Sequence, residues 1–271
     1  MKKAKLNNDL NNYSKTNRKL WNGLTRIHEK SDFYNLEEFK SSRNSLKQIE
    51  IEEVGEVTGK SMLHLQCHFG LDSLSWAVKG AQVTGVDFSS EAISLADSLS
   101  RELQIPVHFI CSDIYDLPDS LNQKFDIVFT SYGVLNWLHD LNKWASLIAH
   151  YLKPGGFLYM IEFHPLLGML NDDGAFEYGY FFHSEPERFF QQGSYANPNA
   201  DFSQESYEWT HGLGEIVTAL IKTGLEIEFL HEFPFSSYNC YPFLEAKKPG
   251  QYVLKNERPS IPLMFSIKAK V

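Results

Sequence analysis

The fold of this chain is decided by residues 61–89, which read SMLHLQCHFGLDSLSWAVKGAQVTGVDFS. Short apolar runs at Lys60–Gln66 and at Ala81–Asp87 have the length and composition of buried strands. Between them, Gly70–Lys79 carries its leucine and valine side chains at helical spacing. A strand, a helix and a second strand in succession predict a βαβ unit, in which the strands run parallel and the crossover is right-handed.

The same alternation continues along the chain. We expect further helices at Ser89–Glu102, Leu141–Leu152 and about 211–223. We expect further strands at Ile105–Cys111, Lys124–Ser131, Phe157–Phe163, Leu225–Phe233 and Ile261–Ala269. The sequence therefore predicts an α/β fold with a doubly wound, mostly parallel sheet.

Four regions follow from this pattern. Residues 1–53 are predicted to form an N-terminal helical cap, with Asn/Lys-rich residues 1–16 either frayed or ordered by docking. Residues 54–164 hold the core alternation, and residues 209–271 complete the same sheet. The insertion at 165–208, after the fifth strand, is rich in Phe and Tyr, which predicts a packed lid or an oligomer interface, as in a homodimer.

Composition limits the partners and the compartment. Lys and Arg number 25 against 34 Asp and Glu, so the formal net charge is −9 and nucleic acid is not expected as the main partner. Cys67, Cys111 and Cys240 show no CxxC spacing, which favours neither a zinc knuckle nor a disulfide framework and fits a reducing cytoplasm. No stretch approaches the roughly 20 apolar residues of a membrane helix, and no apolar run follows the basic N-terminus as in a signal peptide.

The expected strand ends carry residues that suit a nucleoside ligand. Ligands of open parallel sheets bind at the carboxyl ends of the strands. Asp87 ends the second strand and lies 17 residues after Gly70, close to the spacing of an acid that binds ribose hydroxyls. Asp113 follows the third strand and can accept from a purine amine, although it can also cap a helix, while Phe88 and Ile114 can hold the flat ring between them.

These motifs resemble the class I S-adenosylmethionine-dependent methyltransferase family. The resemblance rests on the first turn, the GVDFS and SDIYDLP acids, the FDIVFTS strand, and LKPGGFLYMIE before and within the fifth strand. It implies a Rossmann-like sheet of about seven strands with one antiparallel member, formed by a late strand inserted beside its neighbour. It also implies S-adenosylmethionine as cofactor, S-adenosylhomocysteine as product, and methyl transfer to an oxygen, nitrogen or sulfur atom of a small molecule.

The resemblance assigns the cofactor site to the strand ends. The predicted cofactor-binding residues are His64, Gln66, Cys67, His68, Gly70, Asp87, Phe88, Ser89, Ser112, Asp113, Ile114, Ser131 and Tyr132.

The first turn departs from the family pattern, which usually reads D-x-G-x-G-x-G. Here His64 replaces the acid, Gln66 and His68 replace the first two glycines, and Gly70 remains. One interpretation is a gain, in which Gln66 and His68 bind the amino and carboxylate groups of the methionine part. The alternative is decay of the cofactor site, which would leave a non-catalytic or regulatory protein on the same scaffold.

The substrate side is predicted from the ends of the fourth and fifth strands and from the caps. Alignment is the main requirement of methyl transfer, and an oxygen or nitrogen acceptor can also need a base. The catalytic candidates are His164, Glu162 and His211. The predicted substrate pocket contains Trp21, Tyr34, Asn136, Trp137, His183 and Trp209, and His28 can also close over it.

Two further possibilities concern the chemistry of the site. A metal is not expected, because His183-Ser184-Glu185 lacks an additional ligand set. A nicotinamide-dependent oxidoreductase would share the acid of the second strand, but it would usually keep G-x-G-x-x-G, which the first turn lacks.

Overall fold

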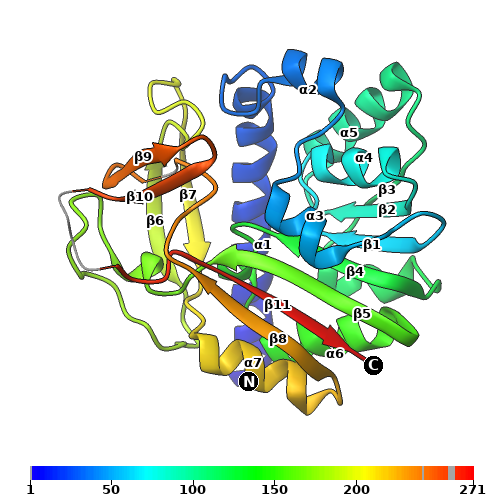
Figure 1. The fold of residues 1–271 in the computed structure, drawn as a ribbon. Helices are drawn as coiled ribbons and strands as arrows, with labels where there is room; N and C mark the ends of the chain where they lie inside the picture. Colours follow the sequence, from blue (N-terminus) through cyan, green and yellow to red (C-terminus); the bar gives the residue numbers. More distant parts are fainter. Residues whose placement is uncertain (1, 240, 256–259) are drawn as a thin grey trace.

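A computed structural model describes residues 2–239, 241–255 and 260–271. At its centre is a seven-stranded sheet in the order β3-β2-β1-β4-β5-β11-β8 (Figure 1). Its strands are β1 (Ser61–Leu65), β2 (Gln82–Asp87), β3 (His108–Cys111), β4 (Phe125–Ser131), β5 (Leu152–Phe163), β8 (Glu226–Phe233) and β11 (Met264–Lys270). Strand β11 runs antiparallel to β5 and β8, whereas the pairs from β3 to β5 are parallel. The predicted doubly wound sheet with one antiparallel member is confirmed.

Helices cover both faces of this sheet. The helices of the described chain are α1 (Lys2–His28), α2 (Leu36–Ser42), α3 (Gln48–Val54), α4 (Leu71–Val78), α5 (Ser90–Leu103), α6 (Leu141–Tyr151) and α7 (Leu213–Lys222), with short 3₁₀ turns η1 (Ile114–Asp119), η2 (Leu135–Trp137) and η3 (Leu167–Met169), and all but α1 lie in the layers beside the sheet. Leu63 and Leu65 of β1 pack in the same apolar cluster as α6 and α7. Their neighbour Met62 packs with Trp76 of α4 and Val54 of α3 on the opposite face, as the two-residue period of a strand requires.

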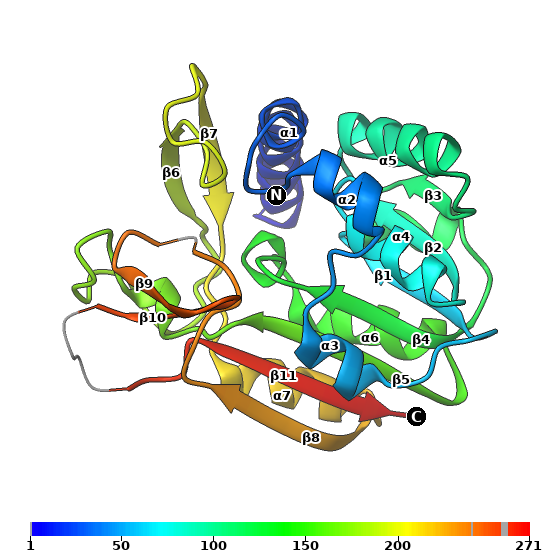
Figure 2. The same cartoon turned by 45° about the horizontal axis from the view of Figure 1, so that its top comes forward.

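Helix α1 lies outside these layers, between the β6–β7 hairpin and α5 (Figure 2). Its buried side includes Leu20 and Leu24 together with the polar residues Asn17, Thr25 and His28. These positions recur at three- and four-residue intervals, so they form one face of the helix. The Asn/Lys-rich N-terminal segment is therefore helical and docked from at least Ser14, whose hydroxyl donates to Asp113.

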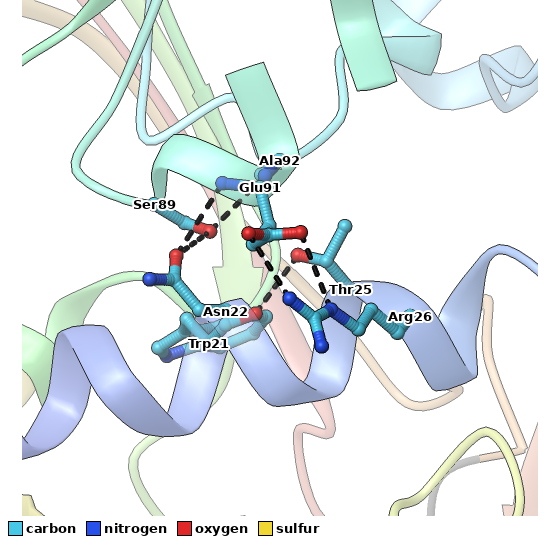
Figure 3. A network of polar contacts seen from close by, with 7 residues as sticks. All are labelled: Trp21, Asn22, Thr25, Arg26, Ser89, Glu91 and Ala92. Atoms are coloured by element: carbon cyan, nitrogen blue, oxygen red, sulfur yellow. Dashed lines mark hydrogen bonds and ion pairs between the residues drawn. The ribbon is translucent and has the colours of Figure 1, made fainter. Parts of the chain in front are cut away.

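A polar network fastens α1 to the N-terminus of α5 (Figure 3). The side-chain oxygen of Asn22 accepts a 2.7 Å hydrogen bond from the Ser89 hydroxyl. The Ser89 oxygen in turn accepts from the Ala92 amide and so caps α5. Arg26 forms an exposed ion pair with Glu91 one turn further along α1.

The insertion and the late connection contain two hairpins that the sequence pattern did not predict. Strands β6 (Glu187–Gln192) and β7 (Ser203–Glu208) pair antiparallel within the insertion. Strands β9 (Leu244–Lys248) and β10 (Gln251–Leu254) pair antiparallel between β8 and β11. None of the described helices is both long and apolar enough to cross a membrane.

Candidate functional site

A cavity of about 870 Å³ opens at the carboxyl ends of β1, β2, β4 and β5. Helix α1, the start of α2 and the ends of the β6–β7 hairpin supply further parts of its wall. The cavity therefore lies where an open parallel sheet binds its ligands, and the N-terminal helix closes one side of it.

The cavity brings together most of the residues predicted from the sequence. Of the predicted cofactor residues it is lined by His64, Gln66, Cys67, His68, Gly70, Asp87, Phe88, Ser112, Asp113, Ile114, Ser131 and Tyr132. It is also lined by His164, Glu162, His211, Trp21, Tyr34, Asn136, Trp137 and Trp209. Ser89 is not in this wall, because its hydroxyl is used at the start of α5. His183 lies instead in a small neighbouring pocket with Glu185.

The first turn keeps a glycine-type backbone without most of its glycines. Gln66 has φ of 55°, His68 has φ of 50° and Gly70 has φ of 78°, so all three adopt the left-handed conformation. This conformation costs an ordinary residue about 1–2 kcal/mol, because its Cβ approaches the following carbonyl oxygen. The first turn therefore differs from the family pattern in its side chains, while the path of its backbone is the one that glycine favours.

In the side chains of Gln66 and His68, one polar atom has a hydrogen-bond partner and the other has none among the described residues. The Gln66 amide nitrogen donates to the Val134 carbonyl at 3.0 Å, which ties the first turn to the loop after β4. The His68 Nε2 atom lies 3.0 Å from Nδ1 of His28, at the end of α1. Gln66 Oε1 and His68 Nδ1 are buried and have no hydrogen-bond partner within the described residues. A buried polar atom without a partner is costly, so each is available to a ligand.

The two acids of the strand ends occupy different surroundings. The Asp87 carboxylate accepts 2.8 Å hydrogen bonds from the amides of His68 and Ser89. Burial nevertheless raises the pKa of Asp87 to about 6. Asp113 accepts from the Tyr115 amide at the start of η1 and from the Ser14 hydroxyl. Asp113 is thus a cap and a cavity residue at once, and both carboxylates retain lone pairs for hydroxyl or amine donors.

His64, which stands where the family has an acid, is fully enclosed. Its Nδ1 atom lies 2.7 Å from the Ser73 hydroxyl of α4, and burial lowers its pKa to about 4. A neutral imidazole in this position carries no charge for a ligand ammonium group, so any such role passes to other acceptors.

The three catalytic candidates contact other parts of the protein, although His164 Nε2 has no hydrogen-bond partner among the described residues. The Glu162 carboxylate accepts from four backbone amides, those of Gly133, Val134, Leu135 and Phe163. In His211, Nε2 lies 2.7 Å from the Leu138 carbonyl and Nδ1 lies 3.2 Å from Glu215. In His164, Nδ1 accepts from the Leu166 amide and Nε2 lies 3.0 Å from the Glu232 carboxylate. All three side chains line the cavity, and each is held by contacts with other parts of the protein.

Some cavity residues were not singled out from the sequence. Ser14 contacts Asp113 from α1, and Glu208 at the end of β7 binds the Asn136 amide at 2.8 Å. Burial raises the pKa of Glu208, because its charge is removed from water. Both residues come from elements that pack over the core, and their role depends on docking that the local sequence pattern does not encode.

The sequence is similar to known proteins over part of its length. A methyltransferase domain family matches residues 62–156. The ubiquinone biosynthesis O-methyltransferase of Coxiella burnetii is 35% identical over 109 residues, which are 40% of this chain and 46% of that protein. The enzyme of the same name from Chromobacterium violaceum is 29% identical over 116 residues, which are 43% of this chain and 50% of that protein. The chain thus spans about half the length of the curated relatives that it matches.

Solved structures resemble this fold over a longer stretch. A crystal structure of an S-adenosylmethionine-dependent methyltransferase from Clostridium acetobutylicum superposes with a TM-score of 0.55 and 17% sequence identity. The superposition covers 90% of this chain and 94% of that one. The shared fold therefore extends well beyond the matched sequence region.

Proposed function

We propose that this chain, which carries a class I S-adenosylmethionine-dependent methyltransferase domain at residues 62–156, transfers a methyl group from S-adenosylmethionine to a small molecule. When bound, the cofactor supplies an electrophilic methyl group on a sulfonium. The acceptor atom is an oxygen, nitrogen or sulfur atom.

The observation that carries this proposal is the set of polar groups around one cavity. Asp87 suits the ribose hydroxyls, and Asp113 suits the exocyclic amine of adenine. Gln66 Oε1 is an acceptor for the ammonium of the methionine part, and His68 Nδ1 belongs to the same turn and has no partner among the described residues. Because the left-handed backbone is retained at both replaced glycines, we favour a modified cofactor site over a decayed one.

The part of the cavity that we assign to the methyl acceptor is lined by aromatic rings and by one amide side chain. Trp21, Trp137 and Trp209 contribute its wall with Tyr34 and Asn136, and we propose that they enclose a small, partly apolar acceptor. Ring contacts such as the 5.4 Å separation of the Trp21 and Trp137 centroids hold this wall in place. The wall would exclude water and align the acceptor with the methyl group, which is the main contribution an in-line displacement requires.

The hydrogen bonds of the predicted bases favour positioning roles. We propose that Glu162 holds the loop after β4 and that His211 joins η2 to α7. His164 accepts a hydrogen bond from the Leu166 amide at Nδ1, whereas its Nε2 atom lies 3.0 Å from the Glu232 carboxylate without a hydrogen-bond partner among the described residues. We propose that it shapes the pocket and that alignment dominates catalysis.

The proposal is tested by calorimetry with S-adenosylhomocysteine. Asp87→Ala is expected to abolish measurable binding, because the ribose hydroxyls lose their acceptor, while Asp119→Ala, on an exposed turn of η1, is the matched control and should bind as the wild type does. Wild-type protein that binds no S-adenosylhomocysteine at millimolar concentration would refute the proposal. Stabilisation of the protein by NAD, and not by S-adenosylhomocysteine, would support the oxidoreductase alternative. Binding without turnover would support the regulatory alternative.

We further propose that the protein works in a reducing cytoplasm, without nucleic acid, and as a homodimer. Cys67 and Cys111 are free thiols, and the chain carries a net negative charge. Phe176 and Phe181 of the insertion are 71% and 75% exposed, which suits a contact between two copies. Light scattering of the purified protein tests the dimer, and a monomer at all concentrations would contradict it.

A further inference from the structure

A chain of hydrogen bonds connects the first turn to the β6–β7 hairpin through α1. His68 Nε2 lies 3.0 Å from His28 Nδ1, and His28 Nε2 lies 3.0 Å from the Ser194 hydroxyl in the loop of the hairpin. The Ser194 oxygen also accepts a 3.0 Å hydrogen bond from the Ala196 amide. Three segments that are far apart in the sequence are thus joined by one line of buried polar atoms.

The partners along this line determine where each proton lies. Burial lowers the pKa of His28 to about 3 and that of His68 well below its usual value, so both rings are neutral and carry one N–H each. The Ala196 amide can only donate, so the Ser194 oxygen accepts from it. If Ser194 donates its own proton to His28 Nε2, then His28 carries its proton on Nδ1 and donates to His68 Nε2. His68 must then carry its proton on Nδ1.

The opposite set of protons satisfies fewer groups. His68 would donate from Nε2 to His28, and His28 would donate to Ser194, whose own proton would have no acceptor among the described residues. An unpaired hydroxyl proton on a serine that is only 7% exposed is costly. The first arrangement is therefore the more stable one.

We infer that Ser194 and His28 are positioning residues that fix the tautomer of His68, so that its Nδ1–H is held as a donor for the carboxylate of the cofactor's amino-acid part. The inference rests on the proposed function for the identity of the ligand. A neutral donor in the first turn replaces the backbone approach that glycine would have allowed. Docking of α1 and of the hairpin is thereby coupled to cofactor affinity, because either one contributes a partner to the same line.

The test compares two ligands that differ in the group concerned. S-adenosylhomocysteine has the carboxylate, whereas 5′-methylthioadenosine has the same nucleoside without the amino-acid part. Ser194→Ala is expected to weaken S-adenosylhomocysteine about 3- to 10-fold by calorimetry, the usual effect of one hydrogen bond, and to leave methylthioadenosine unchanged. Ser194→Thr keeps the hydroxyl and should restore the affinity. Ser266→Ala, which removes a buried hydroxyl from β11 without a hydrogen-bond partner in the described chain, is the matched control.

Nitrogen NMR of the unmodified protein gives a second measurement. Chemical shifts of the imidazole nitrogens distinguish protonated from bare atoms, and we expect Nδ1–H on both His28 and His68 near neutral pH. A proton on Nε2 of His68, or an equal loss of both ligands in Ser194→Ala, would overturn the inference. Wild-type protein that binds neither ligand would overturn the proposed function, and the observed tautomers would then decide on the hydrogen-bond line by itself.

Discussion

Replacing Gln66 by glycine and by alanine measures the strain in the first turn. Both variants lose the hydrogen bond to the Val134 carbonyl, so that loss cancels in the comparison. At φ of 55° the left-handed conformation destabilises alanine by about 1–2 kcal/mol, whereas glycine adopts it without this penalty. Glycine loses about 0.4–1 kcal/mol through the greater freedom of its unfolded chain. The Gln66→Gly variant is therefore expected to be more stable than the Gln66→Ala variant by about 0.8 kcal/mol, within a range of about 0–1.6 kcal/mol.

Urea unfolding of the two variants gives this difference directly from the midpoints and slopes. Ser94, an exposed residue inside α5, provides the matched control pair. There alanine should exceed glycine by about 1 kcal/mol, because the helical conformation suits alanine. If alanine were the more stable residue at position 66 as well, the backbone of the first turn would not be strained and the reasoning about the retained glycine conformation would fail.

Two further predictions concern buried carboxylates. Burial raises the pKa of Glu50 to about 8, so the folded state holds its proton while the unfolded state releases it, and stability is expected to fall as the pH rises from about 5 to about 8. Glu50→Gln keeps an acceptor for the Lys47 amide and should flatten that fall in urea unfolding at the two pH values, whereas an unchanged slope would exclude Glu50 as its source. Glu162→Gln places an amide NH₂ against backbone donors and is expected to cost about 2–3 kcal/mol of unfolding free energy. A cost below about 0.5 kcal/mol would show that the loop after β4 does not depend on this carboxylate.

The core of the fold could be predicted from the sequence because the residue patterns that indicate it are local. The apolar runs of β1, β2 and β4 and the helical spacing of α4 are set by burial on both faces of a parallel sheet. The acids Asp87 and Asp113 reach the cavity because the carboxyl ends of parallel strands share one edge. The resemblance to class I methyltransferases, drawn from the same segment, is confirmed by the domain match at 62–156.

The elements that pack over the core, namely α1 and the β6–β7 hairpin, were harder to predict from the sequence, and the reason is physical. The strands of β6–β7 carry Arg, Gln, Glu and Ser beside their aromatic residues, so they lack the alternation of a half-buried sheet. In α1, the buried face contains the polar residues Asn17, Thr25 and His28. The helix therefore does not show the usual separation of apolar and polar positions in its sequence. The pairing of His28 with His68 depends on how this helix docks, and no spacing within either segment predicts it.

The order of strands in the sheet differs from their order along the chain, and this difference affects how the sheet can form during synthesis. Strand β8 pairs with β11, and β11 follows it by some 30 residues and separates it from β5. While β11 is still inside the exit tunnel, β8 has no neighbour in the sheet, and the edge of β5 has no partner. The nascent chain therefore exposes an open sheet edge until β11 emerges, and truncation before Met264 would leave that edge free for pairing with other chains.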